Sequence, residues 1–290
     1  MSDPATDAFL AHRNLLFTVA YEILGSAADA EDVLQETWLR WAKVDLDQVR
    51  DQRAYLIRIT TRQSLNRIRT NQRRREAYVG SWLPEPLHTA DDADLSERVS
   101  MAMMLVLETL SPTERAVFVL REVFDVGYDE IAEAVDKSAT AVRQIAHRAR
   151  RHVDARRPRA TVSPGEQRAA LAAFQHAVET NDLQALLNVL APDVVVVSDG
   201  GGLKLAALRP VVGAEKAIRF FVGSMRKVGG TLTVEPTVIN GNPALLFRLD
   251  GELDGVAALR VEQGRVTGIY YVRNPEKLSR VESLTPLTLR

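Results

Sequence analysis

Residues 110–151 read LSPTERAVFVLREVFDVGYDEIAEAVDKSATAVRQIAHRARR, and this stretch decides the architecture of the N-terminal half of the chain. Ile131, Ala132 and Val135 recur at helical spacing before the polar tripeptide 136–138, and a second helical pattern follows it. Ser138 is the expected N-cap of the second helix. Two helices joined by so tight a turn predict a helix-turn-helix.

The second helix of this motif predicts a DNA-binding surface. Its inward residues are Val142, Ile145, Ala146 and Ala149. The residues expected to face outward, called the recognition face below, are Thr140, Arg143, Gln144, His147, Arg148 and Arg151. Cations that neutralise phosphates stand here beside side chains that can bond base edges. The alternative is an ordinary helical hairpin with a solvated basic face.

Composition limits the class of protein. A chain of 290 residues with 46% hydrophobic residues can form two or three domains, each with its own core. The absence of cysteine excludes disulfides and thiolate metal sites and is compatible with a reducing compartment. We find neither a secretion signal nor a membrane-length apolar run, so we expect a cytoplasmic protein without a membrane partner.

The net charge of −1 conceals two basic clusters. Residues 50–75 hold nine arginines and a single acid, Asp51. Residues 137–159 hold eight cations and a single acid, Asp154. Because local charge decides nucleic-acid binding, the two clusters predict two separate DNA contacts.

The first cluster lies on a helix expected over residues 54–75. Its inward residues are Ile57, Thr61, Leu65 and Ile68. Its outward residues, called the arginine face below, are Arg62, Asn66, Arg69 and Arg73. Their spacing follows one side of the helix over about three turns, which suits a nucleic-acid backbone, and leaves Asn66 and Gln63 to read bases. Acids placed to pair with these arginines are missing from the helix, which argues against a merely solvated face.

The helix that contains DAEDVLQETWLRW, residues 29–41, predicts a protein-docking surface. Val33, Leu34 and Trp41 fall on its inward side. Asp32, Gln35, Glu36 and Leu39 fall on the opposite side, with Trp38 at the edge. An acidic surface with apolar anchors suits a basic protein partner, while a charged surface with stray apolar residues is the alternative.

The pattern along the chain predicts a multidomain protein with two all-α domains followed by an α+β domain. We expect helical domains at 1–77 and 95–155, with connectors at 78–94 and 156–165, where proline, glycine and charge concentrate. The α+β domain covers 166–290. It is expected to hold helices at 166–190 and 213–227, and strands at 194–198, 231–239, 244–253 and 256–272, with a hairpin turn at Gln263-Gly264.

Three segments in order, DAEDVLQETWLRW, AYLIRITTRQSLNRIRT and LSPTERAVFVLREVF with its ending AVRQIAHRARR, resemble the extracytoplasmic-function (ECF) RNA polymerase sigma factors. The resemblance covers about the first 155 residues, as sigma region 2 and a region 4 helix-turn-helix. It implies that core RNA polymerase binds Asp29, Asp32, Gln35, Glu36, Trp38 and Leu39, called the acidic face below. It implies that the arginine face reads and opens the promoter minus-ten element and that the recognition face reads the minus-thirty-five element. Ser138 and Ala141 depart from the Pro or Gly and the Thr common in the family, so promoter contacts are expected to differ in detail.

Three further motifs, WLPEP at 82–86, DGGG at 199–202 and NPEKL at 274–278, resemble the sigma-factor subgroup with a C-terminal SnoaL-like domain. That domain has an NTF2-like fold with a cone-shaped, curved sheet. The resemblance implies that the motifs contact the linker and the first domain, so that the extension regulates the protein in cis. The residues implied are Trp82, Pro84, Asp199, Gly200, Gly201, Gly202, Asn274, Pro275 and Lys277. A flexible hairpin loop is the alternative for the glycines.

Two other functions stay open from the sequence. The tail resembles polyketide cyclases and ketosteroid isomerases, so it could be an enzyme fused to a DNA-binding module. Its acid-base candidates, which form no convincing constellation, are His176, Asp193, Asp199, Asp250, Glu252, Asp254 and Tyr270. The other function is a ligand-sensing DNA-binding regulator independent of polymerase. We expect no catalytic residue, cofactor or metal, and the tail's cavity leaves room for an unidentified small ligand.

Overall fold

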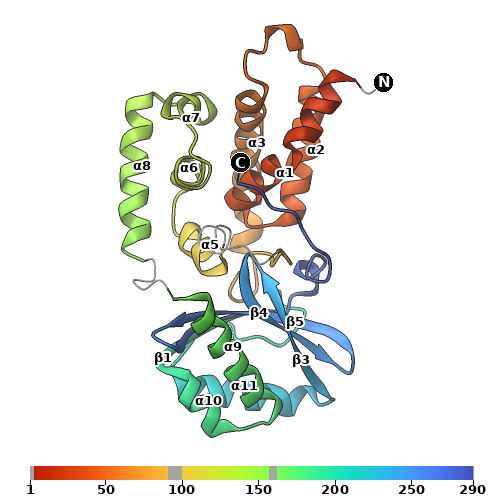
Figure 1. The fold of residues 1–290 in the computed structure, drawn as a ribbon, viewed down its shortest axis with the longest axis vertical. Helices are drawn as coiled ribbons and strands as arrows, with labels where there is room; N and C mark the ends of the chain where they lie inside the picture. The colour runs from red at the N-terminus through yellow and green to blue at the C-terminus, as the bar shows by residue number, and fades with distance from the viewer. Residues whose placement is uncertain (1–2, 91–99, 157–161, 290) are drawn as a thin grey trace. The chain divides into compact units, whose positions relative to one another are not determined.

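The computed structural model describes residues 3–90, 100–156 and 162–289, except for the side chains of residues 72–75, 225, 226 and 228. The chain forms two compact units (Figure 1). The first contains residues 1–76, 103–157 and 286–290, and the second contains 77–102 and 158–285. The segment that follows the first helical domain therefore belongs with the C-terminal unit. Residues 91–94 and 157–161 of the expected connectors lie outside the described residues.

The first unit is helical. Its elements, with the helix that leads into it, are α1 Pro4–Leu24, α2 Ala27–Trp41, η1 Leu46–Gln48, α3 Gln52–Glu76, α5 Met101–Glu108, α6 Pro112–Phe118, η2 Val119–Val123, α7 Tyr128–Val135 and α8 Ala139–Asp154. Gly25 ends α1 in the left-handed conformation, and the Ser26 side chain accepts the Asp29 amide to begin α2. Helices α1, α2 and α3 pack on one another around fully buried Tyr21 and Trp41.

The helix-turn-helix forms as the sequence predicts, from α7 and α8. Asp136 ends α7 with a φ of 55°, and the Ser138 side chain caps α8 by accepting the Ala141 amide. The aspartate thus adopts the left-handed conformation for which glycine is the usual residue. Ahead of this motif, Ser111 and Glu114 form a reciprocal capping box at the start of α6. Local hydrogen bonds therefore define the ends of these short helices.

The second unit is an α+β domain. Its elements are α9 Pro164–Glu179, α10 Leu183–Val189, β1 Leu190–Asp199, β2 Val211–Val212, α11 Ala214–Val228, β3 Leu232–Ile239, β4 Asn242–Leu249, β5 Glu252–Glu262, β6 Arg265–Val272 and η3 Pro275–Lys277. The sheet has six strands in the order β2-β1-β6-β5-β4-β3. Strands β1 and β6 are parallel, and the other neighbours are antiparallel. Helices α9, α10 and α11 lie on one face of this sheet (Figure 1).

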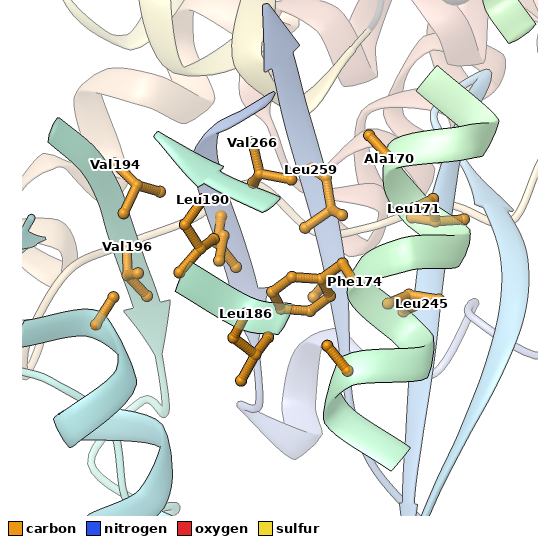
Figure 2. Packing of buried hydrophobic residues seen from close by; sticks show 14 of the residues in the cluster. Ala170, Leu171, Phe174, Leu186, Leu190, Val194, Val196, Leu245, Leu259 and Val266 are labelled. Carbon is orange, nitrogen blue, oxygen red and sulfur yellow. The ribbon is translucent and has the colours of Figure 1, made fainter. Parts of the chain in front are cut away.

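The core of the second unit fills the space between these helices and the sheet. Figure 2 shows Phe174 of α9 among Leu186, Leu245 and Leu259, which come from α10, β4 and β5. All four side chains are at least nine-tenths buried. Burial of each such side chain contributes on the order of 1.5–3 kcal/mol, so this layer is what orders the domain.

The expected fold class is confirmed, but two elements had wrong boundaries and one strand was not expected. The single helix expected over 166–190 is two helices, because Asn181 takes a φ of 51° and Asp182 caps α10. The strand expected over 244–253 ends at Leu249, since Asp250 and Gly251 form a left-handed hairpin turn. The two-residue strand β2 was not expected. The Gln263-Gly264 turn is confirmed, with both residues at positive φ.

Candidate functional surfaces

The recognition face lies on one side of α8, as its sequence predicts. Val142, Ile145, Ala146 and Ala149 are buried against the rest of the unit. The six outward residues Thr140, Arg143, Gln144, His147, Arg148 and Arg151 are all exposed. The guanidinium of Arg143 lies 5.6 Å from the ring centre of Tyr128, a contact that restricts its direction. The structure therefore presents cationic and amide groups together on one helix surface.

The arginine face is partly occupied. Arg62, Asn66 and Arg69 of α3 are exposed, and the Asn66 side-chain oxygen accepts a hydrogen bond from Arg69 at 3.2 Å. The guanidinium of Arg62 donates to the backbone oxygen of Glu133 in α7 at 2.7 Å. The neighbouring Arg58 forms an ion pair with the Glu133 carboxylate at 2.8 Å. The side chain of Arg73 lies outside the described residues.

The prediction that Gln63 reads bases is wrong. Its side chain is only 3% exposed. Helix α3 contacts α1, α2, α6 and α7. The buried part of its surface is therefore wider than the single apolar stripe that the sequence pattern indicates. Thr60 and Ser64 are buried on the same helix. Small polar residues fill these positions because neighbouring helices approach closely there.

The acidic face of α2 is exposed at Asp32, Gln35, Glu36 and Leu39, and Leu39 keeps 61% of its surface accessible. Trp38 is half-buried, with its ring 5.3 Å from that of Phe9. Asp29 is also half-buried and accepts a hydrogen bond from Asn71 at 2.9 Å.

One cation pairs with the acidic face within the same unit. The guanidinium of Arg67 in α3 lies 2.7 Å from the Asp32 carboxylate and within 4 Å of Asp29 and Glu36. Sequence reasoning missed this residue. The sequence did offer one indication of its different role: Arg67 directly follows Asn66 and so lies outside the outward stripe of α3. The pairing orients α2 and α3 relative to each other and leaves the side chains of Asp32 and Glu36 about half exposed.

The DGGG motif binds the segment that follows the first helical domain, and both lie in the second unit. Asp199 is fully buried, and its carboxylate accepts four hydrogen bonds. Oδ1 accepts the Tyr78 hydroxyl at 2.6 Å and the Gly201 amide at 3.1 Å. Oδ2 accepts the Leu83 amide at 2.9 Å and the Lys277 ammonium at 2.7 Å. A buried carboxylate with this many donors is compensated for its lost hydration.

The NPEKL motif completes this arrangement, which we call the linker clamp: Asp199, Asn274 and Lys277 with residues 78–83. The Lys277 ammonium also donates to the Leu83 oxygen at 2.7 Å. It lies 4.2 Å from the Trp82 ring centre and 4.8 Å from that of Tyr78. Asn274 donates to the Tyr78 hydroxyl at 2.8 Å. Burial, and then the hydrogen bond to Asp199, raises the pKa of Tyr78, so its hydroxyl stays a donor.

Close contacts explain why the DGGG motif has glycine at positions 200–202. A Cβ on Gly200 would collide with the Lys204 oxygen, and a Cβ on Gly201 would collide with the Asn274 side chain. Gly201 and Gly202 also have positive φ, at 61° and 75°. A Cβ on Gly202 would lie 3.3 Å from the Val79 side chain. The segment is thus a close-packed contact, and the alternative of a flexible hairpin loop does not describe it.

The proline motifs shape the same contact. Pro84 is buried in the middle of WLPEP, between buried Leu83 and Glu85. Pro275 begins η3, and the Asn274 side chain caps it by accepting the Glu276 amide at 3.1 Å. This short helix places Lys277 one turn beyond Asn274, on the side of Asp199.

A second anchor of the same segment was not predicted. The Asn240 side chain accepts the Leu87 amide at 3.0 Å, and the Leu87 oxygen accepts the Asn240 amide at 2.9 Å. Thr89 accepts the Gly241 amide at 2.7 Å. Asn240-Gly241 is the β3–β4 hairpin turn, and the pair of residues is common in such turns, so its sequence pattern indicates only a hairpin.

Comparisons with known proteins identify the family of this chain. Residues 8–74 match the Sigma-70 region 2 family, and residues 100–153 match the Sigma-70, region 4 family. The chain is 35% identical to the ECF RNA polymerase sigma factor SigJ of Mycobacterium tuberculosis, over 93% of this chain and 92% of that protein. This chain belongs to the ECF RNA polymerase sigma factors. As a sigma factor it acts in transcription initiation with core RNA polymerase and promoter DNA.

Two further relatives support the same family. The probable ECF RNA polymerase sigma factor SigI of M. tuberculosis is 33% identical over 95% of each chain. The crystal structure of M. tuberculosis SigJ matches this sigma factor with a TM-score of 0.77 and 32% identity, covering 98% of this chain and all of that one. The α+β domain after region 4 is therefore part of the shared architecture. In the part of the chain that the structure describes, no helix is long and apolar enough to cross a membrane.

Proposed function

We propose that this sigma factor binds core RNA polymerase through the acidic face, reads the minus-ten element with the arginine face and reads the minus-thirty-five element with the recognition face. The proposal rests on the exposure of Asp32 and Glu36 in α2, of Arg62, Asn66 and Arg69 in α3, and of all six recognition residues in α8. Two weak DNA contacts on separate modules act together only when polymerase holds them at the right separation. Its site of action would be the cytoplasm, where promoter DNA and polymerase meet.

We further propose that the C-terminal domain inhibits initiation in cis by shortening the linker between regions 2 and 4. The observation that carries this is the buried Asp199 carboxylate with its donors from Tyr78, Leu83 and Lys277. Together with the anchor at Asn240, it fixes residues 78–89 against the second unit. Twelve free residues can span any distance up to about 40 Å, so fixing them removes their freedom to adjust the separation of the two DNA-binding modules.

The same proposal assigns no catalysis to the tail. Asp254 is a candidate base that lines a cavity, but Arg273 donates to both its oxygens. Burial opposes ionisation of Asp254, but the hydrogen bonds and charge of Arg273 outweigh it and lower its pKa. A carboxylate stabilised in its charged form is a poor proton acceptor near neutral pH.

Reconstituted transcription with core RNA polymerase tests both proposals. Lys277→Met removes the ammonium between Asp199, Tyr78 and Trp82, and we expect several-fold more transcript because the linker is released. Lys216→Met, at an exposed position of α11, is the matched control and should leave the output unchanged. Point variants are preferable to truncation, because truncation would also remove the last residues of the chain, which belong to the first unit. There the amide of Thr288 donates a hydrogen bond to the Thr18 hydroxyl.

The outcomes separate the two proposals. Inhibition by the linker clamp would be refuted if Lys277→Met gave the same output as Lys216→Met and the parent chain. Amide hydrogen exchange must show in that case that Lys277→Met has released residues 78–83. Failure of the parent chain to associate with core polymerase, or to direct it to any start site, would refute the assigned polymerase and promoter faces.

A further inference from the structure

The second unit contains a cavity between its helices and its sheet. Its volume is about 130 Å³. Most of its wall is apolar, with contributions from Phe174, Leu186, Phe221, Leu232, Phe247 and Ile269. A buried apolar cavity of roughly 150 Å³ stays dry and can bind benzene. The cavity as a whole therefore has about the volume that a single ring needs.

One end of the cavity is charged. Asp254, Tyr271 and Arg273 reach it from β5 and from β6 and the residue that follows. The Tyr271 hydroxyl donates to the Asp254 carboxylate at 3.0 Å. Arg273 donates to the two Asp254 oxygens at 2.8 and 2.9 Å and to the Leu205 oxygen at 2.6 Å. The Asp254 and Arg273 side chains are only 6% and 7% exposed.

The backbone is shaped to make this polar end. The register between β4 and β5 shifts between Phe247 and Arg248, and Asp254 is the extra residue of the resulting bulge. The next residue is Gly255, where a Cβ would lie 2.6 Å from the Val272 oxygen and 2.9 Å from the Tyr271 ring. A buried ion pair contributes little net stability, since desolvation offsets the attraction between the charges. These three features, the bulge, the glycine and the ion pair, lie together at the end of an apolar cavity. Such an arrangement is therefore more typical of a binding site than of a hydrophobic core.

The charges indicate what chemistry fits. A carboxylate ligand would meet the Asp254 carboxylate, and an ammonium ligand would meet Arg273 and Lys204, whose ammonium lies 3.5 Å from Asp254. A neutral hydroxyl can donate to the carboxylate or the phenol oxygen and accept from the guanidinium. Beside that hydroxyl, an apolar ring of the ligand can pack against the apolar wall of the cavity.

We propose that this cavity is a binding site for a small, neutral, ring-containing alcohol or phenol. Its polar end is also continuous with the linker clamp. The Arg273 amide donates to the Asp199 backbone oxygen at 2.7 Å, and the next amide, of Asn274, donates to the same oxygen at 2.9 Å. A ligand on Tyr271 and Arg273 therefore stabilises the backbone that orients Asp199 and Asn274. Ligand binding strengthens the linker clamp, whatever the effect of that clamp on transcription.

Three molecules of one shape test the site on the full chain: p-cresol, toluene and 4-methylbenzoate. Ligand-observed NMR titration should show p-cresol binding about fivefold more tightly than the other two, the effect expected of one net hydrogen bond. Ser224→Phe fills the cavity from α11 and should weaken p-cresol binding about tenfold or more. Ser224→Ala is the matched control and should bind as the parent chain does.

A second variant tests the polar end without filling the cavity. Tyr271→Phe removes one hydroxyl, and p-cresol should then bind no better than about twofold over toluene. Circular dichroism establishes that each variant is folded. Absence of p-cresol binding to the parent chain, equal binding of all three molecules, or unchanged binding to folded Ser224→Phe would overturn the proposed site.

Amide hydrogen exchange tests the connection to the linker clamp. Saturating p-cresol should slow exchange of the Leu83 amide, which Asp199 accepts, and leave that of Ile145 in α8 unchanged. Equal effects at the two amides, or none at Leu83, would overturn the continuity between ligand and linker clamp.

Discussion

The guanidinium of Arg62 donates a hydrogen bond to the backbone oxygen of Glu133 at 2.7 Å, across 71 positions of sequence. Arg62 is the first residue of the arginine face, and Glu133 lies in the first helix of the helix-turn-helix. The two proposed DNA-reading modules therefore contact each other in the first unit through one of the residues that would read DNA. Because a backbone acceptor cannot be removed by substitution, the neighbouring ion pair of Arg58 with the Glu133 carboxylate is the accessible point of intervention.

Glu133→Lys should open this contact. It replaces an attraction to Arg58 with a repulsion at a position where both side chains are partly exposed. Exposed pairs are worth about 0.2–1 kcal/mol, so we expect up to about a fivefold shift toward the separated modules. Amide exchange of α7 and binding to core polymerase measure it. Glu130→Lys, on an exposed position of the same helix, is the control, and an equal effect from it would show that net charge alone is responsible.

Arg143→Ala should weaken promoter binding in a sequence-dependent way. Its side chain is exposed on the recognition face, and loss of a base contact costs about 1–3 kcal/mol at the position read. Arg150→Ala is the matched control on the same helix, because Arg150 pairs with Glu122 of η2. Binding of the polymerase holoenzyme to promoters with altered minus-thirty-five elements measures both. Uniform loss across all promoters from Arg143→Ala would contradict a base-reading role.

Gly201→Ala should disrupt the linker clamp, because the new Cβ would collide with the Asn274 side chain at a φ of 61°. We expect a loss of unfolding free energy of at least about 1 kcal/mol. Gly223→Ala is the opposite case, since its Cβ would meet nothing within 4 Å in the interior of α11. It should stabilise the second unit by about 0.5–1 kcal/mol. Urea denaturation compares the two, and equal signs for them would contradict the steric argument.

Glu22 should make the first unit less stable as the pH rises. Its side chain is fully buried in α1, and burial raises its pKa to about 8, against the opposing effect of the Arg115 charge. Neither carboxylate oxygen has a hydrogen-bond partner among the described residues. The unfolded chain ionises this group at its ordinary pKa near 4.5. The stability that the protonated Glu22 contributes is therefore fully present below pH 4.5 and is lost as the pH rises toward 8.

Glu22→Gln removes this titration. At pH 8 the variant should exceed the parent chain by on the order of 2–4 kcal/mol in unfolding free energy, and the difference should shrink toward pH 4.5. Urea denaturation at several pH values, followed by circular dichroism, measures it. Glu130→Gln, at an exposed position, is the matched control for the loss of a carboxylate outside the core. A constant difference across the pH range would mean that Glu22 is ionised in the folded chain.

Local patterns were sufficient for the elements whose residues act through their own helix. The periodicity of residues 139–154 predicts both the buried and the exposed side of α8, because a helix buried on one side follows the 3.6-residue period. The same reasoning failed for Gln63, since α3 is covered by several helices and its buried side is wider than one stripe. Periodicity carries no information about how many neighbours a helix has.

By itself the sequence determined the order of domains, the helix-turn-helix, the basic and acidic helix faces and the three motifs that mark the linker clamp. Only the tertiary structure decided which residues meet: Lys277 with Asp199 and Leu83, Leu87 with Asn240, and Arg273 with Asp254. The physical reason is that helical periods and turn residues are local preferences, encoded over a few neighbouring positions. A buried hydrogen bond between residues 116 positions apart, such as Leu83 to Asp199, exists only because the packed core brings the two backbones together.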